Sequence, residues 1–295
     1  MVSHNSCPLC NSTEIIYYLT CTDKLVSGEK FKLLRCRGCE FTFTDGYPDE
    51  NESGKYYESD DYISHADSGK NLLQKVYGLA RNYMLRHKRR IIQKITGFSS
   101  GNILDLGCGT GHFLNEMKQS GWDTLGIEIS PKARDYAISR FNLDVKSPAE
   151  LSSLKNRQFD CITMWHVLEH LHDPHKWLKD IRGLLKPSGK LVIALPNNQS
   201  ADAAHYGSDW AAYDVPRHLW HFSPSTFFLF ALTGGFKIKL IKRLPFDPFY
   251  ISILSEKHKG SRLPSVMGIT NGLLFSLASV FSREKSSSLI YILEI

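Results

Sequence analysis

The chain has 295 residues, of which 42% are hydrophobic and 22% are charged, and its formal net charge at pH 7 is +6. This length and composition allow a full hydrophobic core with a small second domain, and they exclude a chain too short to bury its own core. The mildly positive charge is compatible with anionic substrates, but it does not by itself indicate nucleic-acid binding.

Two segments indicate the cellular location of the protein: the start of the chain and its longest apolar stretch. Residues 1–10 are polar and lead into a cysteine pair, so they lack the character of a signal peptide. The apolar stretch 266–281 is interrupted by polar residues and is too short to span a bilayer. We therefore expect a cytoplasmic protein with no transmembrane segment.

Four of the seven cysteines form two pairs with the spacing C-x-x-C, Cys7 with Cys10 and Cys36 with Cys39. The odd total and the paired spacing favour a metal site in a reducing compartment over a disulfide framework. Two such pairs can supply four thiolates to one zinc ion. Because all four ligand positions are cysteine, we expect a closed, structural site in a zinc ribbon over residues 1–48.

Residues 49–98 are expected to form a linker and a helical cap. The linker, 49–66, is acidic and rich in tyrosine, whereas residues 69–96 carry apolar side chains at helical spacing. The same helix has a run of basic residues. These could bind phosphates, but a solvated helix face is the commoner explanation for such a run.

Residues 102–114 have the pattern of a strand, a glycine-rich turn and a helix. The apolar run from Ile103 to Leu106 predicts a short buried strand, which three glycines follow: Gly107, Gly109 and Gly111. This pattern opens a doubly wound α/β sheet, in which ligands bind at the carboxyl ends of the strands.

The glycine spacing and the nearby charges indicate the kind of ligand. A dinucleotide-binding turn requires G-x-G-x-x-G, and His112 occupies the position of the third glycine. Asp105 would repel a pyrophosphate there, but it suits a ligand that carries an ammonium and a sulfonium. Glu128 ends the next predicted strand, at the place of a ribose-binding carboxylate about 20 residues further on. These features disfavour an NAD-dependent oxidoreductase.

The pattern D-x-G-x-G-x-G that begins at Asp105 resembles motif I of class I S-adenosylmethionine (SAM)-dependent methyltransferases. The predicted strand 159–165 and the segment after it resemble the post-motif region of the same family. The resemblance implies that SAM is the cofactor. Trp165 and His166 stand at the carboxyl end of that strand and should face the cofactor or the acceptor. The cofactor-binding residues expected are Asp105, Gly107, Cys108, Gly109, Gly111, Glu128, Ile129, Trp165 and His166.

The resemblance also implies the fold. We expect an α/β protein with a Rossmann-like sheet of seven strands, the last pair antiparallel, in a methyltransferase domain over residues 99–295. Two inserts interrupt this domain, at 197–222 and 244–285. The second insert contains a predicted apolar helix over about 264–282. It could cover an acceptor pocket, join two subunits in a homodimer or touch lipid, and the pattern favours core packing or dimerisation.

The first insert, 197–222, is a long polar and aromatic stretch, and a loop this long inside a compact domain is usually functional. Residues 214–224 resemble a segment of the zinc-ribbon-bearing methyltransferases, which include sugar methyltransferases. We expect an acceptor site here, with His218 or His221 as general base, because the pKa of imidazole lies near neutrality. The other residues expected at the acceptor are His166, Tyr213 and Arg217, the last of which would bind an anionic group.

These features predict a SAM-dependent methyltransferase that acts on a small molecule, such as a sugar or sugar nucleotide, by in-line transfer with a histidine base. One alternative is an RNA methyltransferase that holds RNA with its zinc ribbon and basic helix. The absence of an Asn- or Asp-Pro-Pro-aromatic motif after the fourth strand argues against methylation of a base amine. A second alternative is a non-catalytic zinc-ribbon interaction protein, which the intact Asp105 and Glu128 disfavour. The expected partner is therefore a small, anionic acceptor and not a nucleic acid.

Overall fold

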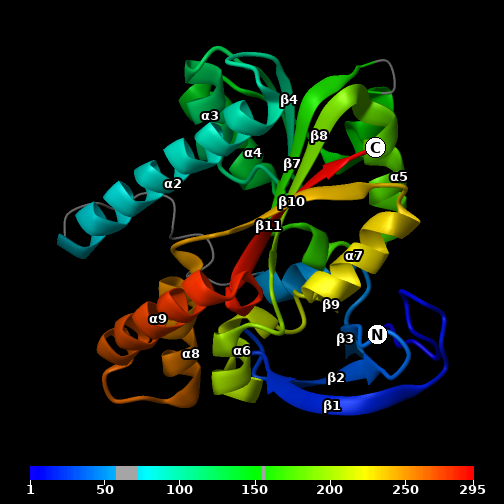
Figure 1. Cartoon of the computed structure of the whole chain (residues 1–295), viewed down its shortest axis with the longest axis vertical. Helices are drawn as coiled ribbons and strands as arrows, with labels where there is room; N and C mark the ends of the chain where they lie inside the picture. Colours follow the sequence, from blue (N-terminus) through cyan, green and yellow to red (C-terminus); the bar gives the residue numbers. More distant parts are fainter. Residues whose placement is uncertain (58–71, 155–156) are drawn as a thin grey trace. The chain divides into compact units, whose positions relative to one another are not determined.

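The computed structural model describes residues 1–57, 72–154 and 157–295 (Figure 1). The chain divides into two compact units. The first contains Met1–Ser59, Leu168–Pro174 and Ala194–Tyr291, and the second contains Asp60–Val167, His175–Ile193 and Ile292–Ile295. The predicted linker at 49–66 lies partly outside the described residues.

Seven strands form one hydrogen-bonded sheet in the order β10-β11-β8-β7-β4-β5-β6. Their bounds are β4 (Asn102–Leu106), β5 (Asp123–Ile127), β6 (Asp144–Lys146), β7 (Phe159–Trp165), β8 (Leu185–Pro196), β10 (Lys237–Arg243) and β11 (Ser288–Glu294). Strand β4 pairs in parallel with β5 and with β7, and β5 pairs in parallel with β6. The prediction of an α/β, Rossmann-like sheet with an antiparallel last pair is confirmed.

The described helices of the second unit include α2 (Leu72–Thr96), α3 (His112–Gln119), α4 (Pro131–Phe141) and α5 (Pro174–Leu184). Helix α2 agrees with the predicted helix, and its Ile91 and Ile92 are buried. Helix α4 begins as a capped helix should, because the Ser130 hydroxyl accepts a hydrogen bond from the Ala133 amide and proline occupies the first turn.

A second, four-stranded sheet lies in the first unit, in the order β1-β2-β3-β9. Its strands are β1 (Ile15–Thr22), β2 (Lys30–Cys36), β3 (Thr42–Asp45) and β9 (Trp220–His221), and all its pairings are antiparallel. Thr42 pairs with His221, and Phe43 pairs with Trp220. The insert at 197–222 therefore adds a strand to the sheet of the N-terminal ribbon.

The helices of the first unit include α6 (Ala201–Tyr206), α7 (Pro224–Thr233), α8 (Asp247–Lys259) and α9 (Pro264–Phe281). Helix α7 begins with a capping box made by Ser223 and Thr226. Helix α9 matches the apolar helix predicted for the second insert. Within the described part of the chain, α9 is the one helix that is long and apolar enough, by length and composition, to cross a membrane. The prediction that this stretch is too short to span a bilayer is therefore wrong, because the helix begins at Pro264 and reaches 18 residues.

Candidate functional site

The glycine-rich turn joins β4 to α3, and its three glycines have the positive φ angles that favour glycine: 68° at Gly107, 54° at Gly109 and 78° at Gly111. A Cβ atom at Gly107 would lie 2.5 Å from Val167 Cγ2, and one at Gly111 would lie 2.6 Å from Leu143 Cδ1. At Gly109 a Cβ would meet no atom within 4 Å. Packing therefore requires glycine at two positions, whereas the backbone at Gly109 is open to a ligand.

Asp105 lies two residues before this turn, with its side chain buried in the sheet. The Thr163 hydroxyl donates a hydrogen bond to Asp105 Oδ1 at 2.5 Å. Burial raises the pKa of Asp105 to about 7, against the opposing effects of that hydrogen bond and of Lys88. The Lys88 ammonium also lies 4.2 Å from the ring centroid of Trp165. A carboxylate in such a low-dielectric position interacts strongly with a cationic ligand.

Glu128, at the end of β5, lies against the same turn. Its Oε2 accepts a hydrogen bond from the Gly109 amide at 2.8 Å, and its Oε1 accepts one from the Ser130 amide at 2.8 Å. A carboxylate has about four acceptor positions, so each oxygen retains capacity for a ligand hydroxyl. The next residue, Ile129, is 78% exposed.

Trp165 is the last residue of β7, and His166 follows it. Strand β7 lies beside β4, where Met164 pairs with Leu106. Both therefore lie at the sheet edge that carries the glycine turn. His166 has a φ of 58°, which is uncommon for a residue other than glycine. Strained backbone of this kind is concentrated at functional sites.

The four predicted zinc ligands lie together in the ribbon. Cys7 Sγ is 3.6 Å from Cys39 Sγ, Cys10 Sγ is 3.6 Å from Cys36 Sγ, and all four sulfurs lie within 4.8 Å of one another. Bonded sulfurs would be about 2.05 Å apart. Sulfurs at the corners of a tetrahedron around zinc, each about 2.3 Å from the metal, would be roughly 3.8 Å apart. The spacing therefore fits one zinc ion.

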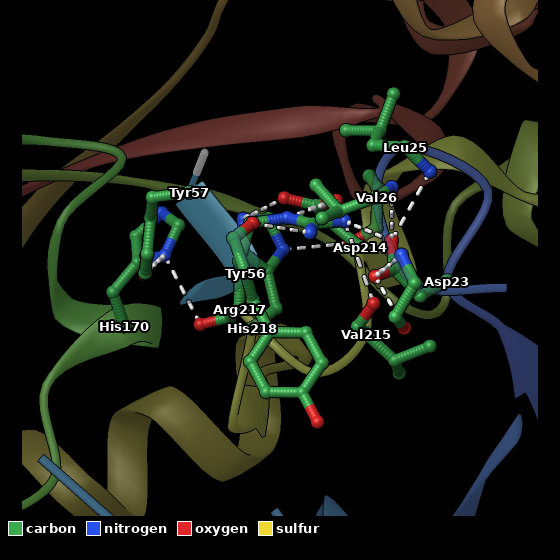
Figure 2. Close-up of polar contacts among 12 residues, drawn as sticks. Asp23, Leu25, Val26, Tyr56, Tyr57, His170, Asp214, Val215, Arg217 and His218 are labelled. Carbon is green, nitrogen blue, oxygen red and sulfur yellow. Dashed lines mark hydrogen bonds and ion pairs between the residues drawn. The ribbon is translucent and has the colours of Figure 1, made fainter. Parts of the chain in front are cut away.

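Arg217 lies at the centre of a buried polar network in the first unit (Figure 2). Its guanidinium donates to Asp23 Oδ1 at 2.8 Å, to Asp214 Oδ1 at 2.7 Å and to the Tyr56 carbonyl at 2.8 Å. The side chain is 1% exposed. Burial alone would raise the pKa of the Asp214 carboxyl, but the charge of Arg217 holds it below its usual value. This enclosed position does not fit the predicted anion-binding role and favours a structural one.

The other residues predicted for the acceptor site in the insert are also buried. The Thr44 hydroxyl donates to the His218 carbonyl at 2.8 Å and lies 2.9 Å from His221 Nε2, so that nitrogen has to be the donor. Burial lowers the pKa of His221 well below its ordinary value. His218 Nδ1 donates to the Ala212 carbonyl at 2.8 Å, which leaves Nε2 unprotonated in the neutral ring. Tyr213 packs edge-on against His221, with ring centroids 5.2 Å apart, and is 2% exposed.

Comparison with known proteins gives the chain its family. A family model described as a methyltransferase domain matches residues 80–238, which is more than half of the chain. The chain belongs to this methyltransferase family. The matched range contains the glycine turn, Asp105, Glu128 and His166, and it identifies the protein as a SAM-dependent methyltransferase.

Curated relatives of this methyltransferase include enzymes of one kind from several bacteria. It is 24% identical over 164 residues to a ubiquinone biosynthesis O-methyltransferase of Xanthomonas axonopodis pv. citri, which covers 51% of this chain and 69% of the relative. It is 32% identical over 133 residues to the protein of the same name from Cereibacter sphaeroides, covering 42% of this chain and 54% of the relative.

Solved structures show the same fold. Magnesium protoporphyrin IX methyltransferase from Synechocystis PCC 6803 has a TM-score of 0.55 and 13% identity, with 83% of this chain and 99% of that chain covered. A [4+2]-cyclase has a TM-score of 0.50 and 17% identity, with 70% of this chain and 79% of that chain covered. Because a cyclase shares it, this fold does not by itself decide the reaction of a protein.

The methyltransferase also brings together three side chains that sequence reasoning did not group. Glu169 and His170, in the short 3-10 helix η4 (Leu168–His170), and His218 each place a ligand-type atom within 4.8 Å of the others. The rings of the two histidines are 4.5 Å apart, and burial lowers the pKa of His170 to about 4. A carboxylate beside two imidazoles can relay a proton or hold a divalent cation. No local sequence motif indicates such a group, because His218 is far from Glu169 and His170 in the sequence.

Proposed function

We propose that this methyltransferase transfers the methyl group of SAM to a hydroxyl group of a small polar acceptor, such as a sugar or sugar nucleotide. The observation that carries the proposal is the buried carboxylate of Asp105 beside the open backbone of Gly109, with Glu128 against the same turn. The O-methyltransferases among the relatives support an oxygen nucleophile. The resemblance of residues 214–224 to a branch with sugar methyltransferases supports the acceptor class.

In this proposal Asp105 attracts the ammonium group of SAM, and the glycine turn accommodates the amino acid part. Glu128 binds the ribose hydroxyls, and the exposed Ile129 borders the adenosine. SAM supplies a methyl group already activated by its sulfonium. The protein therefore has to align the two reactants, exclude water and remove a proton from the acceptor.

Among the three histidines predicted as catalytic, the proposal takes His166 as the general base. It directly follows β7 at the edge of the glycine turn, and its backbone is left-handed, with a φ of 58°. His221 is less suited, because its Nε2 donates to Thr44 and its pKa is well below neutrality. His218 is the second candidate, since its Nε2 is available to accept a proton.

Replacement of Asp105 by asparagine should weaken SAM binding roughly 10- to 100-fold, because it removes a charge-assisted interaction with the ammonium. The raised pKa of Asp105, about 7, adds a pH dependence. Below this pH the carboxylate gains a proton and loses its charge, so the affinity of the wild type for SAM should fall as the pH decreases through 7. Isothermal titration calorimetry with SAM measures both effects.

The matched control is Asp144→Asn, which removes an exposed carboxylate at the start of β6 and should leave the affinity and its pH profile unchanged. If the Asp105→Asn variant bound SAM with wild-type affinity, Asp105 would not be part of the cofactor site. A wild-type protein that takes up no SAM would overturn the proposed function itself.

Replacement of His166 by asparagine should lower kcat by about 10²- to 10⁴-fold, the usual contribution of a general base, with little change in SAM affinity. Asparagine tolerates the left-handed conformation, so the backbone should be preserved. The assay follows transfer of labelled methyl from SAM to a panel of hydroxylated small molecules that includes sugar nucleotides. His218→Asn and His221→Asn serve as comparisons. If the loss appears in His218→Asn instead, the base is His218.

We also propose that Cys7, Cys10, Cys36 and Cys39 hold a structural zinc ion. The sulfur spacing supports one tetrahedral site, and four thiolates leave no position open for catalysis. The ion would fix the two turns that carry the cysteine pairs at the end of the β1–β3 sheet.

A further inference from the structure

Helix α9 lies beside α8 (Figure 1). Its Gly268 and Gly272 face that helix. A Cβ atom at Gly268 would lie 2.5 Å from Ile253 Cα, and one at Gly272 would lie 2.7 Å from Phe249 Cα. The two backbones are therefore in close contact, and no larger side chain would fit between them. A surface helix of a water-soluble protein ordinarily does the opposite, since it turns its large apolar residues inward.

Polar side chains on the inward face fix the rotation of α9 about its axis. Asn271 Nδ2 donates to the Tyr206 hydroxyl at 3.0 Å and to Glu256 Oε1 at 2.9 Å. Ser279 Oγ accepts a hydrogen bond from Arg243 Nη1 at 3.1 Å. Turning the helix to bury its apolar side chains would break all of these bonds.

The outward face of α9 is a continuous apolar stripe. Its members recur every three or four residues and are each between 51% and 61% exposed: Val266, Ile269, Leu273, Leu277 and Val280. Phe281, at the end of the helix, is 91% exposed. An 18-residue helix is about 27 Å long, so this stripe far exceeds the scattered apolar residues that are normal on a surface.

Basic residues flank α9 in the sequence on both sides. The exposed basic residues next to α9 in the sequence are Lys257, Lys259 and Arg262 before it and Arg283 and Lys285 after it. Within residues 257–285, which the structure describes throughout, Glu284 is the one acidic residue.

We propose that α9 docks this stripe into the surface of a lipid bilayer that contains anionic lipids. An apolar helix face flanked by basic residues is the arrangement that lies in the membrane interface, where the apolar side chains reach the acyl chains and the basic ones meet anionic headgroups. Spanning the bilayer does not fit. A span would need lipid on every side of the helix, whereas one face of α9 is fixed to α8, whose last turn carries Lys257 and Lys259.

The charge distribution also argues against a second copy of this chain as the occupant. In a twofold pair of α9 helices, parallel or antiparallel, basic ends would meet basic ends, and like charges placed together are destabilising. An anionic surface neutralises both ends at once.

The test is co-sedimentation of the full chain with vesicles. Wild-type protein should bind vesicles that contain phosphatidylglycerol and should not bind pure phosphatidylcholine vesicles. Leu273→Ser with Leu277→Ser should weaken this binding on the order of a hundredfold, because two exposed leucines lose their burial in lipid. Lys257→Gln with Lys259→Gln should weaken it about 30-fold at low salt.

The matched control is Leu229→Ser with Leu232→Ser, which changes two exposed leucines of α7 and should leave vesicle binding unchanged. Light scattering on the same samples reports self-association. Equal binding to both kinds of vesicle, or binding to neither, would overturn the proposal. The proposal would also be overturned if the wild type were a dimer and Leu273→Ser with Leu277→Ser converted it to a monomer. The stripe would then be the contact between two copies of the chain.

Discussion

Replacing Cys36 with serine is expected to remove the zinc ion and to unfold the ribbon sheet. A closed four-thiolate site needs every ligand, and structural zinc contributes on the order of 10 kcal/mol to the folding of small domains. Two strands of the ribbon sheet are short, since β3 has four residues and β9 has two. Elemental analysis for zinc and thermal unfolding measure the loss.

Cys21→Ala is the matched control for this experiment. Cys21 is also a buried cysteine of the ribbon sheet, but it lies outside the group of four sulfurs. This variant should keep its zinc and lose little stability. Purified wild-type protein without stoichiometric zinc would contradict the proposed site, as would an unchanged unfolding temperature in the Cys36 variant.

Replacing Arg217 with methionine is expected to destabilise the protein by about 3–5 kcal/mol, the usual cost of removing one partner from a buried ion pair. Methionine fills much of the volume, but it leaves the carboxylates of Asp23 and Asp214 without their cation. The cost arises because an uncompensated charge then remains away from water. Urea unfolding followed by circular dichroism gives the change in the free energy of unfolding.

Arg157→Met provides the comparison. Arg157 pairs with Asp123 at the surface, where both side chains are well exposed, and such pairs contribute about 1 kcal/mol or less. An Arg217 variant of normal stability but with a raised KM for the acceptor would restore the predicted anion-binding role.

The seven-stranded sheet was predicted from the resemblance to the methyltransferase family, whereas single strands, turns and caps were predicted from local signals. The apolar run before Gly107 and the Ser130 cap each report on a few neighbouring residues, and the structure has both features as expected. Strand β9 could not be predicted, since two residues show no alternation and their partner, β3, is far away in the sequence. Helix α8 was missed because its apolar residues do not follow a clear helical period.

The same distinction applies to the candidate site. The cofactor turn was predictable because its requirements, positive φ angles and a nearby carboxylate, belong to one short segment. The role of the insert was harder to predict. An arginine and two histidines in a loop can form a catalytic site or a buried structural network, and the local sequence is the same in both cases. Asp23 and Thr44, which lie in the ribbon, supply their partners, and the sequence gives no sign of that approach.

The pairing of β9 with β3 also constrains how this protein can be re-engineered. A graft of residues 1–48 onto another methyltransferase would carry a sheet with an unsatisfied edge at Thr42 and Phe43, and such edges invite aggregation. A chain that began after the ribbon would leave Trp220 and His221 with no strand to join. The two segments therefore form one exchangeable piece, and a working chimera would have to import both together.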